Sequence, residues 1–109
     1  MRRITTEDLD RVVVMINNLQ GVDSRPRTKV GGKLVPTAWN YHIGGAYGGW
    51  RLEQHGSSGS EIRDVFQVGY VPKRELYGLL QAYSAGIIDG SRDYEKEDAE
   101  VAAIHREEE

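Results

Sequence analysis

The hydrophobic pattern of the first twenty residues is that of an amphipathic helix. Apolar residues recur every three or four positions, which places them on one face of a helix with 3.6 residues per turn. Thr5 stands where its hydroxyl can cap the first turn, and Gly21 can adopt the left-handed conformation that ends a helix. The pattern therefore predicts a helix from Thr5 to about Gly21. Its apolar face consists of Leu9, Val12, Val13, Ile16 and Leu19.

The next stretch changes to the period of two that is typical of β-strands. Gly31-Gly32 separates two short alternating runs, and two glycines tolerate the positive φ angles of a tight primed turn. Residues 28–35 are therefore predicted to form a β-hairpin. Pro36 is expected to end its second strand or to mark an edge.

The alternation continues around a glycine-rich segment. Trp39, Tyr41 and Ile43 alternate with polar residues, and the same pattern resumes after the glycines of residues 44–49. Residues 62–70 are rich in β-branched and aromatic side chains, which favours a further strand. The sequence predicts an antiparallel meander of three to four strands.

A second helix is expected after Val71-Pro72, because proline suits the first helical position. Its apolar face is predicted to consist of Leu76, Leu79, Leu80, Tyr83 and Ile87, and Gly90 is expected to end it. The fold class is thus α+β, with a three- to four-stranded antiparallel sheet packed with two main helices. We interpret residues 1–90 as one domain and residues 91–109 as an acidic C-terminal tail, for which a frayed helix over residues 94–109 is the favoured interpretation.

Charge is divided unevenly along these 109 residues. Residues 1–90 contain 11 Lys or Arg and 9 Asp or Glu, whereas residues 91–109 contain 3 and 8. An acidic tail of this kind is commonly a solvated extension, and the alternative is a helix that covers the basic body or imitates a polyanion. The chain has no cysteine, which excludes disulfides, thiolate zinc sites and thiol nucleophiles. Neither export nor a membrane span is expected.

Catalytic and cofactor motifs are not evident in the sequence. The segment 44–50 is rich in glycine but lacks the lysine and hydroxyl of a phosphate-binding loop, so a structural corner or an aromatic contact surface is favoured. His42 with Asp64 or Glu53 is the best arrangement for a small enzyme, although no nucleophile or set of metal ligands accompanies it. We therefore expect a protein that is not an enzyme and that binds neither cofactor nor metal.

Two basic stretches and two aromatic residues are the candidates for binding a partner. Lys73 and Arg74 lie in the first turn of the second helix, where cations oppose the helix dipole, and with the free N–H groups they could hold an anion. Local pairing with Glu75 would explain them equally well. The second stretch lies on the predicted hairpin, where charge also protects an exposed strand from edge pairing. The candidates are Tyr47, Trp50, Arg25, Arg27, Lys29, Lys33, Lys73 and Arg74.

The chain also resembles a family of small uncharacterised proteins of tailed phages. The resemblance covers roughly residues 9–90 and rests on three segments, which are Gly44 to Leu52, Asp64-Val65-Phe66 and the helix start Val71 to Tyr77. The family has no settled activity, so the resemblance implies a phage accessory protein made in the host cytoplasm. It supplies no catalytic residues.

Three functions follow from these observations. The leading expectation is a non-enzymatic phage accessory protein that binds a host protein, for example an inhibitor of a host-defence complex of the anti-CRISPR kind. One alternative is a small nucleic-acid-binding module that uses the basic hairpin and the start of the second helix, which an overall pI of about 5.6 disfavours. The other is a small enzyme. A homodimer formed through an exposed strand is left open, and no membrane partner is expected.

Overall fold

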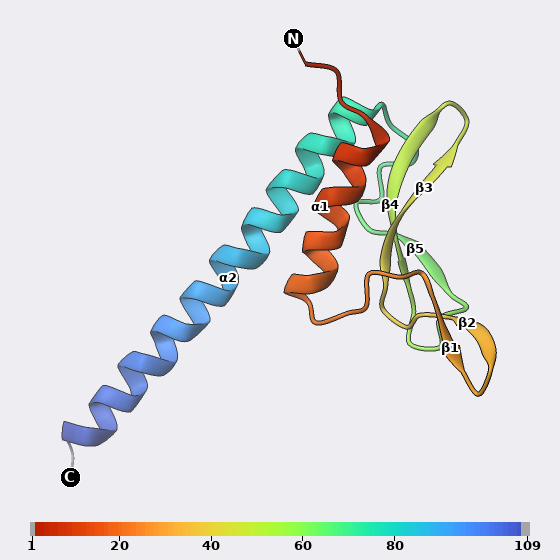
Figure 1. Cartoon of the computed structure of the whole chain (residues 1–109). Coiled ribbons are helices and arrows are strands. Elements are labelled where there is room, and N and C mark those ends of the chain that lie inside the picture. Colours follow the sequence, from red (N-terminus) through yellow and green to blue (C-terminus); the bar gives the residue numbers. More distant parts are fainter. Residues whose placement is uncertain (1, 108–109) are drawn as a thin grey trace.

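The computed structural model describes residues 2–107, and it places side chains for residues 2–91. Its elements form two helices and two antiparallel sheets, which confirms the α+β class (Figure 1). In chain order they are α1 (Thr6–Leu19), β1 (Arg27–Val30), β2 (Lys33–Pro36), β3 (Tyr41–Ala46), β4 (Gly49–His55), β5 (Ile62–Asp64) and α2 (Lys73–Glu107).

Helix α1 begins and ends as its sequence predicts. The Thr5 hydroxyl accepts a hydrogen bond from the Asp8 N–H, and the Asp8 carboxylate accepts one from the Thr5 N–H, so the two residues form a capping box. Gly21 has φ 70° just after the helix, and the Val22 N–H donates to the Asn17 carbonyl. The predicted apolar face is buried except for Leu19, which is 41% exposed.

The strands form two separate sheets. In the three-stranded sheet the order is β3-β4-β5, with Ile43 opposite Leu52 and Glu53 opposite Asp64. Just beyond β5 the Val65 N–H donates to the Leu52 carbonyl, and the chain then returns to β4 at an isolated bridge between Trp50 and Val71. The predicted strand over residues 62–70 is therefore three residues long.

Both helices cover the same face of the three-stranded sheet (Figure 1). Helices α1 and α2 pack against each other as well as against the strands, and the predicted antiparallel sheet packed with two main helices is therefore confirmed. Burying one sheet face under a pair of helices gives a two-layer domain with a single core. The core consists of Leu9, Val12, Val13, Ile16, Tyr41, Leu52, Val71, Leu76 and Leu80.

Helix α2 does not end at Gly90. It continues to Glu107, and its C-terminal half extends away from the sheet (Figure 1). A glycine weakens a helix by about 1 kcal/mol relative to alanine but does not by itself end one, so Gly90 was wrongly interpreted as a stop. The expectation that the tail covers the body or imitates a polyanion depends on side chains of residues 92–109, which lie outside the described residues.

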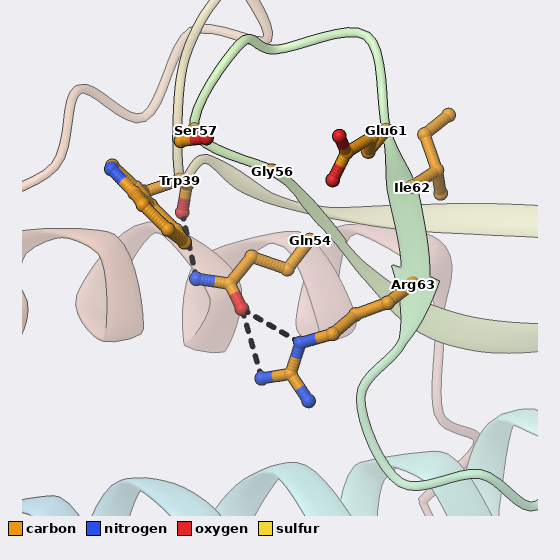
Figure 2. Close-up of a pocket in the computed structure, with 7 residues that line it drawn as sticks. All are labelled: Trp39, Gln54, Gly56, Ser57, Glu61, Ile62 and Arg63. Atoms are coloured by element: carbon orange, nitrogen blue, oxygen red, sulfur yellow. Dashed lines mark hydrogen bonds between the residues drawn. The ribbon is translucent and has the colours of Figure 1, made fainter.

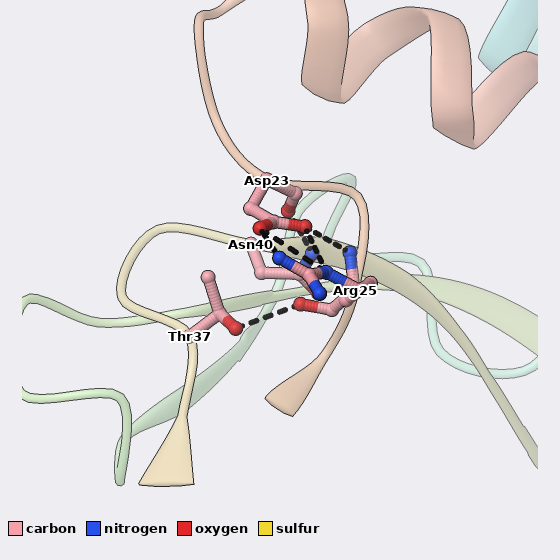
Figure 3. Close-up of polar contacts among 4 residues, drawn as sticks. All are labelled: Asp23, Arg25, Thr37 and Asn40. Atoms are coloured by element: carbon pink, nitrogen blue, oxygen red, sulfur yellow. Dashed lines mark hydrogen bonds and ion pairs between the residues drawn. The ribbon is translucent and has the colours of Figure 1, made fainter. Parts of the chain in front are cut away.

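The β1–β2 hairpin stands apart as a two-stranded sheet. Val30 lies opposite Lys33, and Gly31 and Gly32 turn the chain with φ 59° and 81°, as predicted. The base of the hairpin is joined to the body by polar contacts (Figure 3). The Thr37 hydroxyl donates to the Arg25 carbonyl at 2.7 Å, and the Asn40 amide donates to the Asp23 carbonyl at 2.7 Å.

Helix α1 also closes part of the free edge of β3. The Asn17 side chain is fully buried, its amide donates to the Tyr41 carbonyl at 2.9 Å, and its Oδ1 accepts from the Tyr41 N–H at 2.8 Å. The amide thus occupies the place of a neighbouring strand at this one residue.

Candidate partner-binding surface

The β3–β4 turn exposes a tyrosine in an unfavourable backbone conformation. Tyr47 and Gly48 form this two-residue turn with φ 53° and 75°. Such a turn favours asparagine or glycine at its first position, because a left-handed conformation costs other residues about 1–2 kcal/mol. The Tyr47 side chain is nevertheless 95% exposed. Burial of the ring within the chain therefore does not offset this cost.

A row of aromatic and cationic side chains continues from Tyr47. The Tyr47 ring meets the Tyr70 ring edge-on, with 5.6 Å between centroids, and the Arg51 guanidinium lies 4.5 Å from the centre of the Tyr70 ring. These contacts are cation–π and aromatic pairs of the kind that contribute about 1 kcal/mol or less at exposed sites. They hold the base of Tyr47 in place and leave its ring in solvent.

A cationic hollow lies beside this turn, at the start of α2. Its volume is about 390 Å³, and the Lys73 ammonium lies 5.3 Å from the centre of the Trp50 ring. The Arg74 guanidinium donates to the Arg2 carbonyl at 3.2 Å. The lining residues are Arg3, Ile4, Gly48, Trp50, Pro72, Lys73 and Arg74. We call Tyr47, Trp50, Arg3, Lys73 and Arg74 the aromatic–cationic end.

The structure brings together one group of predicted site residues and separates the other. Tyr47, Trp50, Lys73 and Arg74 gather because the bridge between Trp50 and Val71 joins β4 to the start of α2. The β1–β2 hairpin, which carries or adjoins four other predicted cations, lies at the end of the sheets opposite the β3–β4 turn (Figure 1). These cations are Arg25, Arg27, Lys29 and Lys33.

One hairpin cation has a partner of its own. Arg25 pairs with Asp23 at 2.7 Å (Figure 3), and this ion pair lowers the pKa of Asp23 to about 2 and raises that of Arg25. Arg25 therefore belongs to the base of the hairpin, and it is a weaker candidate for partner binding than its sequence neighbours.

Trp39 is a second exposed aromatic residue, which sequence reasoning assigned to the same strand face as Tyr41 and Ile43. It lies instead in a turn that is closed by a hydrogen bond from the Asn40 N–H to the Thr37 carbonyl. The φ angle of Trp39 is 64°, and the residue is 53% exposed. That position of the turn favours glycine. The sequence signal for a turn over residues 37–40 was Pro36, which ends β2.

Trp39 forms one wall of a hollow of about 270 Å³ beside β5 (Figure 2). The Gln54 amide donates to the Trp39 carbonyl, and its Oε1 accepts two hydrogen bonds from Arg63, at 3.1 and 2.9 Å. Glu61 and Ile62 lie on the far side of this hollow. The charges of opposite sign give this site no clear preference for an anion or a cation.

The outer face of the sheet carries the charged pair that the enzyme alternative requires. His42 Nε2 lies 3.1 Å from Glu53 Oε1, and Arg51 Nε donates to Glu53 Oε2 at 2.7 Å. Gly44 makes room for this carboxylate, since a Cβ there would lie 2.4 Å from the Glu53 Cδ. Asp64 lies 4.0 Å from Arg51 and does not reach His42.

Burial, followed by the neighbouring His55, lowers the pKa of His42, and Glu53 opposes this shift. The second ring nitrogen, Nδ1, is buried and lacks a hydrogen-bond partner within the described residues. The two side chains therefore form a structural hydrogen-bonded pair, and no nucleophilic side chain among the described residues bonds the His42 ring. Among the residues that the structure describes, no three His, Cys, Asp or Glu side chains are placed to hold a metal ion.

Comparisons of the chain with protein-family models, with curated proteins and with solved structures gave no match. Within residues 2–107, no helix combines the length and the apolar character needed to cross a membrane.

Proposed function

We propose that this chain is a non-enzymatic phage accessory protein that acts by binding a protein of the host, with the aromatic–cationic end as its contact surface. The observation that carries the proposal is Tyr47, which is 95% exposed in a left-handed backbone conformation. Tyrosine is unfavourable at this position of the turn and stays almost entirely in solvent, so a partner explains its presence better than stability does.

The neighbours of Tyr47 indicate which chemical groups a partner should present. Tyrosine, tryptophan and arginine are the residues that most often dominate the energy of protein interfaces. Arg3, Lys73 and Arg74 line the hollow, and no acidic side chain of the described residues does so. A partner that presents carboxylates beside an apolar or aromatic side chain matches this surface, and we include an inhibitory contact with a host-defence complex in the proposal.

Affinity capture with matched variants tests the proposal. The tagged chain, its Tyr47→Ala variant and its Leu34→Ala variant are incubated with nuclease-treated host lysate, and retained proteins are quantified by mass spectrometry. Leu34 is a suitable control because it is also exposed, at 61%, but lies on the distant hairpin. We expect one host protein that the wild type and Leu34→Ala retain equally and that Tyr47→Ala loses at least about 10-fold, since a hot-spot residue contributes 2 kcal/mol or more.

Two results would contradict the proposal. If Tyr47→Ala retains the same protein as the wild type, the aromatic–cationic end is not the contact. If both variants lose it equally, the effect is one of general surface hydrophobicity. Circular dichroism of each variant shows that the fold is intact.

The β1–β2 hairpin supports a second candidate function, which is binding of duplex DNA. A two-stranded antiparallel ribbon fits the major groove of duplex DNA, and Arg27, Lys29 and Lys33 have no ion-pair partner within the described residues. For this function, Lys29→Ala with Lys33→Ala should reduce the slope of log affinity against log salt by about 2 for duplex DNA. The matched control is Lys73→Ala with Arg74→Ala, which should leave the slope unchanged.

A further inference from the structure

The outer edge of β3 carries strand-pairing groups that nothing in the described chain uses. Alternate residues of an antiparallel strand direct their N–H and C=O groups to opposite sides. Because Tyr41 bonds Asn17 at the outer edge, Ile43 and Gly45 direct their groups to the same edge. No hydrogen bond within residues 2–107 reaches these groups. Two donors and two acceptors are therefore open beyond the point that Asn17 closes.

This edge lacks the features that usually prevent strand addition. Natural edge strands are short, charged, bulged or interrupted by proline. The opposite edge of the sheet, β5, is three residues long and carries Arg63, and the β1–β2 hairpin carries lysines and Pro36. Strand β3 is six residues long and has neither a charged residue nor a proline. Gly45 is exposed, so a neighbouring strand could approach.

We propose that β3 pairs with β3 of a second copy of this chain, in antiparallel orientation about a two-fold axis at Gly44. In this register Ile43 of each copy lies opposite Gly45 of the other, and the two pairs exchange four main-chain hydrogen bonds. The pairing uses all four open groups. Asn17 limits it at Tyr41, and the turn at Tyr47 limits it at the other end.

Two features of β3 favour a second copy of the chain as its pairing partner. They are the glycine at the two-fold axis and the absence of charged residues in the strand. Residues at the axis form a narrow, non-hydrogen-bonded pair with their Cα atoms about 4.5 Å apart, and Gly44 brings no Cβ into that space. A two-fold axis places identical residues near one another, which opposes dimers of charged strands. Strand β3 itself has no Asp, Glu, Lys or Arg, and the Glu53 carboxylate of β4, which lies over Gly44 near the axis, is paired with Arg51. The register is therefore self-complementary.

The expected dimer is weak. A single pair of short strands buries less than the roughly 1,200 Å² of total surface found in stable complexes, so we expect dissociation constants of about 10 μM to 1 mM. The pairing uses main-chain groups of β3 and needs no side chain of the aromatic–cationic end. It is thus independent of the proposed function, and either can fail without the other.

Sedimentation equilibrium and amide exchange of the wild-type chain test the dimer together. Between about 10 μM and 1 mM the mass should rise from 12.2 kDa toward twice that value. Over the same range, exchange of the Ile43 and Gly45 amides should slow as the monomer fraction falls, and at the upper end it should be slower than in the monomer by about 2-fold for a dissociation constant of 1 mM and by more than about 10-fold for one of 10 μM. Exchange of Gly32 should not change. A monomer at all concentrations would overturn the proposal. So would a dimer in which the Ile43 and Gly45 amides exchange at the monomer rate.

Two variants of Gly45 distinguish the effect of losing the N–H on dimerisation from the effect of adding side-chain atoms. Gly45→Pro and Gly45→Ala both add a Cβ, which would lie 3.0 Å from the Trp50 ring, but only proline lacks the N–H. We expect Gly45→Ala to dimerise and Gly45→Pro to remain monomeric, whereas equal dimerisation of both would contradict the register. If Gly45→Pro does not fold, a mixture of isotope-labelled and unlabelled wild type decides the question. A nuclear Overhauser effect between the Gly44 Hα atoms of two copies supports the axis, and its absence in the dimer overturns it.

Discussion

The molecule contains two β-hairpins that turn in the same way but are stabilised differently. Strands β1 and β2 join at Gly31-Gly32, and β3 and β4 join at Tyr47-Gly48, with positive φ at all four residues. The first hairpin has the residues that such a turn prefers, whereas the second has a tyrosine at its first position. The comparison separates what local turn chemistry determines from what packing determines.

Packing differs as clearly as the turns do. No helix covers β1–β2 in Figure 1, and Val30 and Leu34 are 63% and 61% exposed. On β4, Leu52 is fully buried beneath both helices. The β3–β4 hairpin can therefore keep an unfavourable turn residue, because its core contacts hold the strands in register. The exposed apolar residues of β1–β2 contribute little to stability.

The largest expected difference between the hairpins is the loss of unfolding free energy when a leucine of each is replaced by alanine. Leu52→Ala should lower the free energy of unfolding by about 2–5 kcal/mol, since it leaves a cavity in the core. Leu34→Ala should change it by less than about 0.5 kcal/mol, as for most exposed positions. Urea unfolding monitored by circular dichroism measures both. Similar losses in the two variants would mean that β1–β2 packs on the body after all.

The second prediction concerns the edge of the packed hairpin. Asn17→Ala leaves the N–H and C=O of Tyr41 without partners, which should lower the free energy of unfolding by about 1–3 kcal/mol. Asn18→Ala is the matched control, because Asn18 is exposed on the same helix and should stay within about 0.5 kcal/mol of the wild type. Equal effects would show that the loss arises from the helix and not from the strand edge.

A smaller effect is expected when the first turn residues are exchanged. Gly31→Tyr should lower the free energy of unfolding by about 1 kcal/mol, because φ is 59° and no neighbour lies near the new side chain. Tyr47→Gly should raise it by about 0.5 kcal/mol, since glycine relieves the strain but adds entropy to the unfolded chain. Thermal and urea unfolding measure both changes. A loss of stability in Tyr47→Gly would mean that Tyr47 is kept for stability, which removes the main support for the proposed contact.

The same division between local and tertiary signals explains what the sequence could predict. Helix α1 and the β1–β2 turn were correctly predicted because a capping residue, a periodic apolar face and a pair of glycines act within a few residues of one another. The end of α2 was wrong at Gly90, where a local signal was too weak to stop a helix. Trp39 was misplaced because simple alternation does not distinguish the start of a strand from a preceding turn.

The candidate site was predicted residue by residue but not as a surface. Tyr47, Trp50, Lys73 and Arg74 were each singled out, yet the contact that gathers them is the bridge between Trp50 and Val71, 21 positions apart in the chain. The sequence carries no signal for that pairing. The hairpin cations were grouped with them by charge alone, and the fold places them at the other end.

The smallest expected effect concerns the outer face of β3–β4, which has no counterpart on β1–β2. Burial lowers the pKa of His42 below its usual value of about 6.5. The unfolded chain therefore binds more protons than the folded chain between that lowered pKa and 6.5, so stability should fall as the pH drops from about 6.5. His42→Gln should remove this part of the pH dependence, measured by urea unfolding at pH 7 and pH 5 beside a nuclear magnetic resonance titration of the ring. Titration of His42 at or above 6.5 would show that its pairing with Glu53 outweighs burial, and stability would then be greatest below the unfolded pKa. The aspartates with lowered pKa values, Asp8 and Asp23, titrate below 3.8 and do not affect this range.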